Sequence, residues 1–157
     1  MNRKTFKIIS GGQTGADRAA LDWAIAHGIP HGGWCPRERK AEDGSIDPRY
    51  QMEETPSSDY AQRTAWNVSD SHGTVVFSIA TLLTGGSKKT VALAQKYCKP
   101  LLHLSREAGS STPEQKLLRF IYKHRIQILN VAGPRASKEP EVGAFVKEVL
   151  DRTWPSP

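Results

Sequence analysis

The chain has 157 residues, of which 38% are hydrophobic, and its 22 Lys and Arg against 16 Asp and Glu give a formal net charge of +6. This length suffices for one domain over residues 1–157 with an ordinary core, and two cysteines without a signal peptide or a membrane-length apolar run predict a cytoplasmic protein. The basic residues are dispersed, which favours a small anionic ligand and argues against membrane or specific nucleic-acid binding.

Short apolar runs and helical periodicity alternate along the chain. In chain order, we expect a strand at residues 6–10, a helix at 16–27, a short strand within 29–35, a long polar connection over 36–56, a helix at 58–71 and a strand at 74–79. These are followed by a glycine turn at 82–87, a helix at 88–97, a strand at 100–104, a helix that begins after Ser110 and Ser111 with Pro113 in its first turn, a strand at 126–131, a helix at 140–152 and a tail at 154–157.

Strands that are mostly followed by helices are typical of an α/β fold. We therefore predict a single-domain Rossmann-like three-layer sandwich with a mainly parallel sheet of about five or more strands. Such sheets bind ligands beyond the carboxyl ends of their strands. Four unusual segments follow expected strands, at residues 11–17, 34–44, 79–90 and 132–138, so we expect them to line one crevice.

The stretch GGQTGADR joins the first expected strand to the first expected helix. Its glycines let the backbone approach a ligand closely, and the helix presents unpaired N–H groups and the positive end of its dipole. These features are typical of an anion site, although the same glycines also suit a tight turn without a ligand. The binding candidates here are Gly11, Gly12, Gln13, Thr14, Gly15, Asp17 and Arg18.

Asp17 is an acid in the first helical turn, where it complements the helix dipole. It shares a helix face with Leu21 and Ala24, so we expect its carboxylate to lean toward the crevice. An acid beside an anion site suits a ligand that also presents N–H or O–H donors.

A second glycine-rich stretch, LLTGGSKKT, follows the strongest expected strand. It offers N–H groups, hydroxyls and lysines to an anion, or again forms only a turn. Its binding candidates are Thr84, Gly85, Gly86, Ser87, Lys88 and Thr90. In a third segment, NVAGPRASKEP, Arg135 suits bidentate contact with an oxyanion, and Lys138 lies close behind it.

Other polar residues allow two interpretations each. Cys35 is either a buried structural cysteine or a ligand for a soft metal or sulfur group. Glu42 and Asp43 either bind the N–H groups of a heterocycle or are solvated. The helix expected at 58–71 has one polar face, which lies toward either the crevice or water. This face carries Arg63, Thr64, Asn67 and Asp70. The sequence contains no Cys/His metal box and no visible nucleophile–base pair, so we expect no metal site.

Five motifs occur in a fixed order, and they are GGQTGADRAALDWA, GGWCP with AEDG, RTAWNVSDS, LTGGSKKT and NVAGPR. Together they resemble the putative molybdenum carrier family, whose members are relatives of molybdenum-cofactor carrier proteins, over residues 8–146. This family is similar in fold to the lysine-decarboxylase-like Rossmann proteins, which include cytokinin-activating phosphoribohydrolases. Glu38 departs from the family pattern, which has a glycine there.

The resemblance implies a carrier that binds and protects molybdenum cofactor (molybdopterin), or a related oxyanion such as molybdate, at both glycine-rich loops. It also implies a homo-oligomer, either a dimer or a tetramer. Two alternatives share the fold: a nucleotide sensor, or an enzyme acting on a nucleotide or nucleotide sugar with Asp17, Asp70 or Glu42 as its acid–base group. The phosphoribohydrolase relatives use a glutamate just beyond the glycine pair, whereas residues 88–92 contain no acid, so we expect a binding protein rather than an enzyme.

Overall fold

A central sheet of five parallel strands organises the computed structural model, which describes residues 2–109 and 112–155. The order across the sheet is β2-β1-β9-β7-β8. These strands are β1 (Lys7–Ile9), β2 (His31–Gly32), β7 (Gly73–Ser78), β8 (Leu101–Ser105) and β9 (Ile128–Ala132). The predicted α/β sandwich with a parallel sheet is therefore confirmed.

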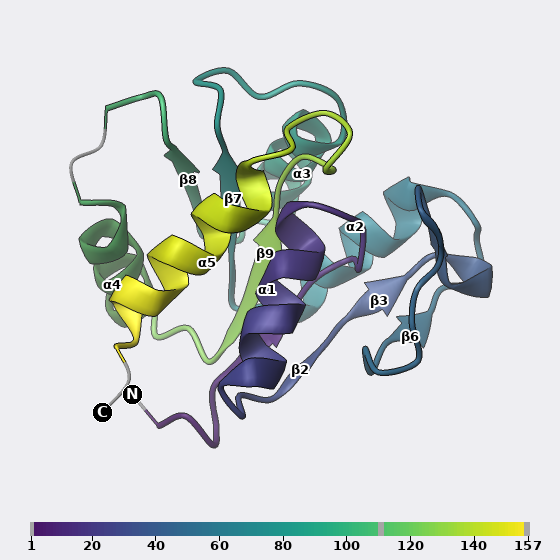
Figure 1. Ribbon diagram of the computed structural model, residues 1–157, viewed down its shortest axis with the longest axis horizontal. Coiled ribbons are helices and arrows are strands. Elements are labelled where there is room, and N and C mark those ends of the chain that lie inside the picture. Colours follow the sequence, from purple (N-terminus) through teal and green to yellow (C-terminus); the bar gives the residue numbers. More distant parts are fainter. Residues whose placement is uncertain (1, 110–111, 156–157) are drawn as a thin grey trace.

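Helices cover both faces of this sheet (Figure 1). One layer packs α1 (Ala16–Ala26) and α4 (Pro113–Lys123) against α5 (Val142–Thr153). The other layer pairs α2 (Tyr60–Asp70) with α3 (Gly85–Lys96). The main hydrophobic core lies between the first layer and the sheet, where Val75, Phe77 and Leu129 are fully buried. No helix in the described residues is long and apolar enough to cross a membrane.

The strand order becomes simple when the strands are counted from β9 instead of from the N-terminus. Counted as β9, β1, β2, β7 and β8, the sheet has the order 3-2-1-4-5, which is that of the first five strands of the doubly wound dinucleotide-binding fold. The strand that opens such a fold is therefore supplied here by the C-terminal part of the chain. The order reverses between β9 and β7, and this switch point is where open α/β sheets form their ligand crevice.

The two ends of the described chain lie side by side near Arg3 and Pro155, which is the geometry that a rearranged order of the same strands requires (Figure 1). Arg3 donates a hydrogen bond from Nη2 to the carbonyl oxygen of Pro155 at 3.1 Å. The ring of Trp154 packs against Phe6 and Trp23, with ring centroids 5.1 and 5.5 Å apart. The predicted tail is thus wrong at Trp154, which is buried, because the tail prediction took no account of this aromatic cluster. Residues 156–157, like Ser110 and Ser111, lie outside the described part of the chain.

The segment 29–35, which was predicted to contain one short strand, contains two. The chain turns away from the main sheet at Gly33, where the backbone has φ +127°. A Cβ at this position would meet the carbonyl oxygen of Ser10 at 2.2 Å, so the turn requires glycine. The next strand, β3 (Trp34–Cys35), pairs instead with β6 (Glu53–Glu54) in a separate two-stranded sheet.

The long polar connection also contains short regular elements that sequence periodicity did not predict. They are the 3₁₀ turn η1 (Arg37–Arg39) and a hairpin of β4 (Lys40–Ala41) with β5 (Gly44–Ser45). Glu38, which stands where the resembled family has a glycine, has φ 67°. Glycine adopts this left-handed conformation without a steric penalty, so the glycine that the resemblance implies here would suit the turn.

Candidate functional site

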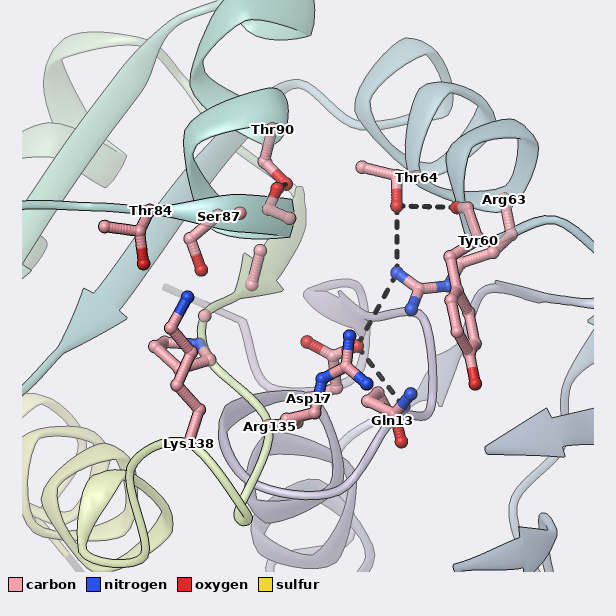
Figure 2. A pocket seen from close by; sticks show the side chains of 15 residues that line it. Gln13, Asp17, Tyr60, Arg63, Thr64, Thr84, Ser87, Thr90, Arg135 and Lys138 are labelled. Carbon is pink, nitrogen blue, oxygen red and sulfur yellow. Dashed lines mark hydrogen bonds and ion pairs between the residues drawn. The ribbon is translucent and has the colours of Figure 1, made fainter. Parts of the chain in front are cut away.

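A cavity of about 140 Å³ lies at the switch point between β9 and β7. Four segments far apart in the sequence form its wall: the loop before α1, the first turn of α2, the first turn of α3 and the loop after β9 (Figure 2). Eight predicted site residues line it, namely Gln13, Asp17, Thr84, Gly85, Gly86, Ser87, Thr90 and Arg135. Six do not, namely Gly11, Gly12, Thr14, Gly15, Arg18 and Lys88.

The amino end of α3 supplies the free backbone donors of the cavity. The helix begins at Gly85, three residues earlier than predicted, so the glycine pair forms its first turn. Within the described residues, the N–H groups of Gly85, Gly86 and Ser87 have no hydrogen-bond acceptor, and the side chain of Thr84 does not cap them. Unpaired N–H groups at the positive end of a helix dipole attract anions.

Three cationic side chains accompany these donors, those of Arg63, Arg135 and Lys138. The Lys138 Nζ lies 3.2 Å from the position that a Cβ on Gly85 would take, so its ammonium stands beside the first turn of α3. Figure 2 shows this ammonium pointing toward Thr84 and Ser87. Because the cations come from two different segments, an anion in the cavity would meet positive charge from two sides.

Tyr60 lines the cavity although no sequence motif singled it out. The guanidinium carbons of Arg63 and Arg135 lie 5.2 and 5.8 Å from its ring centroid, and the Lys40 ammonium lies 5.0 Å from it. Its spacing to Arg63 and Thr64 fits one helix face, which is a signal that could have found it. That face does look into the cavity at these three residues.

The other two polar residues that spacing placed on this face of α2 serve a structural role. Asn67 exchanges hydrogen bonds with the backbone of Trp34 at 2.8 and 2.9 Å. Asp70 accepts a hydrogen bond from Trp34 Nε1 at 2.8 Å. Both side chains therefore hold α2 against β3 instead of lining the cavity.

Asp17 is the acidic side chain in the cavity wall, and it is only 4% exposed. Its Oδ2 accepts a hydrogen bond from the Gln13 N–H at 3.3 Å and lies 3.9 Å from Arg63 Nη1. Burial raises the pKa of Asp17 to about 6, and the nearby Arg63 opposes this increase. The carboxyl group can therefore gain or lose a proton near neutral pH.

The first glycine-rich loop differs from the second because most of its backbone donors are already used within the protein. The N–H groups of Gly12, Gln13 and Thr14 donate to Ser10 Oγ, Asp17 Oδ2 and Gln13 Oε1, respectively. The Ala16 N–H donates to the carbonyl oxygen of Pro134 at 3.3 Å. This loop thus shapes the wall through Gln13 and Asp17, while the second loop carries the free N–H groups.

The carboxylates of Glu42 and Asp43 are neither free in solvent nor aimed into the cavity. Glu42 accepts hydrogen bonds from the hydroxyl of Thr14 and from Ser137 Oγ, the latter at 2.6 Å. Asp43 forms a bidentate ion pair with Arg18, whose Nη2 donates to Oδ1 at 3.1 Å. The two acids therefore attach the β4–β5 hairpin to α1 and to the loop after β9.

Cys35 takes the structural alternative of the two that its sequence context allowed. It is fully buried in a small apolar cluster with Leu21, Ile46 and Tyr50, and this burial raises the pKa of its thiol. In the described residues, no group of three or more His, Cys, Asp or Glu side chains could hold a metal ion.

A wider and more apolar groove of about 490 Å³ adjoins the cavity between α2 and α3. The two share Tyr60, Thr64, Gly86 and Arg135. Ala61, Ala92 and Leu93 provide the apolar part of the groove. The arrangement can thus hold a compact anionic group in the cavity and a larger apolar or planar group beside it.

The fold and the position of this site define a class of protein. The chain belongs to the circularly permutated YpsA SLOG family, whose pattern it matches over residues 8–154. The strand order that starts from β9 agrees with this description. Among solved structures, the chain is similar to a putative molybdenum carrier protein from Syntrophus aciditrophicus SB, with 47% identity and a TM-score of 0.91 over 97% of this chain and 96% of that one. No curated protein matches the sequence.

Proposed function

We propose that this protein is a carrier that binds and protects molybdenum cofactor or a related molybdenum oxyanion. The observation that carries the proposal is the convergence of three unpaired N–H groups of α3 with Lys138 and Arg135 on one cavity at the switch point. The similar protein from Syntrophus, named as a putative molybdenum carrier protein, supports the choice of cargo. The predicted cytoplasmic location and homo-oligomeric state remain predictions.

The size of the cavity bears on how such a cargo would bind. Pockets that enclose a whole drug-sized ligand measure roughly 300–1,000 Å³, so the cavity of about 140 Å³ suits only one compact group. We infer that this group is a phosphate or an oxyanion, and that the ring system of a larger cargo lies in the adjoining groove. The lack of a metal-ligating cluster among the described residues favours recognition of oxygen atoms over direct ligation of molybdenum.

Lys138→Ala tests the proposed anion site. It removes the ammonium beside the first turn of α3, and we expect the affinity for molybdate and inorganic phosphate to fall about tenfold, which corresponds to about 1.4 kcal/mol. Isothermal titration calorimetry at fixed ionic strength measures the change. Lys88→Ala is the matched control, because Lys88 lies in the same helix turn but is exposed and does not line the cavity. Equal losses for both variants would refute the assignment.

A second candidate function is suggested by Asp17. A buried acid with a pKa of about 6 inside a ligand cavity can serve as a general acid or base, so an enzyme acting on a nucleotide is the alternative. Of the three acids considered for this role, Asp17 alone lines the cavity, while Asp70 and Glu42 bond to other parts of the protein. Release of free base from a nucleoside monophosphate, lost in Asp17→Asn, would favour the enzyme over the carrier.

A further inference from the structure

The tip of the β4–β5 hairpin places a carboxylate among hydrogen-bond donors that belong to the ligand-binding edge of the sheet. Glu42 Oε1 accepts from the Thr14 hydroxyl and, at 3.2 Å, from the Ser137 N–H, while Oε2 accepts from Ser137 Oγ at 2.6 Å. Thr14 lies in the first glycine-rich loop, and Ser137 lies in the loop after β9. Two hydroxyl groups and one N–H group therefore surround this carboxylate.

These donors would serve an oxyanion equally well. Hydroxyl groups and backbone N–H groups around a negative charge are the donors with which proteins hold phosphate, and charged acceptors strengthen such hydrogen bonds. The surroundings favour negative charge, because the hydrogen bonds from Ser137 and Thr14, with a contribution from Arg135, lower the pKa of Glu42. Arg135 also lines the cavity, so its charge acts on both places.

The hairpin tip is exposed, whereas the residues on either side of it are anchored in the protein. Ala41 and Ile46 are buried and anchor the two sides of the hairpin, whereas residues 42–45 are exposed. Besides the Glu42 carboxylate, the tip is held by the Asp43–Arg18 ion pair and by the Glu42 N–H, which donates to Gln13 Oε1 at 2.9 Å.

We propose that Glu42 is a tethered anion that fills an oxyanion subsite next to the cavity, and that a second anionic group of the cargo takes its place. This inference rests on the proposed function, since it adds a second subsite to the same cargo site. The cargo class that follows is a molecule with two anionic groups, such as a diphosphate or a phosphate ester that also carries an oxyanion. Gln13 connects the two subsites, because it lines the cavity and bonds to the Glu42 N–H.

Glu42→Ala tests the subsite, with inorganic phosphate as the probe in isothermal titration calorimetry. The wild-type protein is expected to bind one equivalent of phosphate in the cavity, and the variant is expected to bind two. Asp43→Ala is the matched control, because it releases the same hairpin tip from Arg18 while the Glu42 carboxylate stays in place. It is expected to bind one equivalent, as in the wild type.

Two double variants separate this inference from the proposed function. Adding Ser137→Ala to Glu42→Ala should remove the second equivalent, whereas adding Lys138→Ala should weaken only the first. One equivalent in both the wild type and Glu42→Ala would overturn the tethered-anion proposal and leave the cavity site standing. Phosphate bound only by Glu42→Ala, in a manner dependent on Ser137, would support the subsite and refute the cavity site.

Discussion

Gly15→Ala is expected to lower the free energy of unfolding by about 3 kcal/mol or more. The residue has φ 81° and ψ −127°, a conformation that side chains with a Cβ rarely adopt. A Cβ at this position would also lie 2.4 Å from the carbonyl oxygen of Pro134 and 2.8 Å from the nitrogen of Ala136. Both neighbours are backbone atoms, which cannot move aside as the end of a flexible side chain can.

Urea unfolding measures this loss, and Gly28→Ala is its matched control. Gly28 also has a positive φ, 64°, but no atom lies within 4 Å of the Cβ it would gain. Its substitution should therefore show only the conformational part, about 1 kcal/mol. Equal losses in the free energy of unfolding at the two positions would mean that the loop after β9 shifts to accommodate the new Cβ at no measurable cost. In that case the close approach of the two loops would not be what requires glycine.

Gly15 shows which features of a glycine-rich loop can be predicted from the sequence and which cannot. The stretch GGQTGADR predicted a strand that turns through glycines into a helix, and the structure has that turn. The purpose of the glycine depends on Pro134, which is more than one hundred residues away in the sequence and contacts Gly15 only because β9 lies beside β1. Local pattern predicts elements, but long-range pairing determines which loops meet.

At the amino end of α3, the structure differs from the sequence-based prediction in where the helix begins. Gly85 and Gly86 have low helix propensity, so the pattern favoured a turn that ends at Ser87. In the structure they form the first helical turn, where a helix leaves its N–H groups unpaired in any case. This difference matters for the site, because the N–H groups that the first turn of α3 leaves unpaired are the free donors of the cavity.

The cationic residues of the site were predicted only in part, because their positions also depend on which segments meet in the fold. Arg135 follows a strand end, where a position in the ligand crevice is general for parallel sheets. The polar face of α2 was visible from its spacing, but spacing alone did not tell whether Arg63 faces water or the cavity. Tyr60 shares the helix face of Arg63 and Thr64, but its contact with Arg135 depends on how α2 lies against the loop after β9, which spacing does not predict.

Asp17→Asn is expected to stabilise the protein at pH 8, although it changes a residue of the candidate site. The pKa of Asp17 is raised from 3.8 to about 6 in the folded protein, so the folded state binds the proton more tightly than the unfolded state. The resulting stability is fully present below about pH 4 and is lost as the pH rises through about 6. The difference between these two pKa values corresponds to roughly 3 kcal/mol at pH 8.

Asparagine resembles the protonated acid and does not ionise, so the variant should be stabler than the wild type by roughly 3 kcal/mol at pH 8 and about equal to it at pH 4. Urea unfolding of both proteins at the two pH values measures the difference, in which the titration of all other groups cancels. Asp43→Asn serves as the control of opposite sign, because the hydrogen bond and charge of Arg18 lower the pKa of Asp43. That variant should lose stability at pH 8. A loss of stability in Asp17→Asn at pH 8 would contradict this prediction. It would mean that the attraction between the ionised carboxylate and Arg63 outweighs the cost of burying the charge.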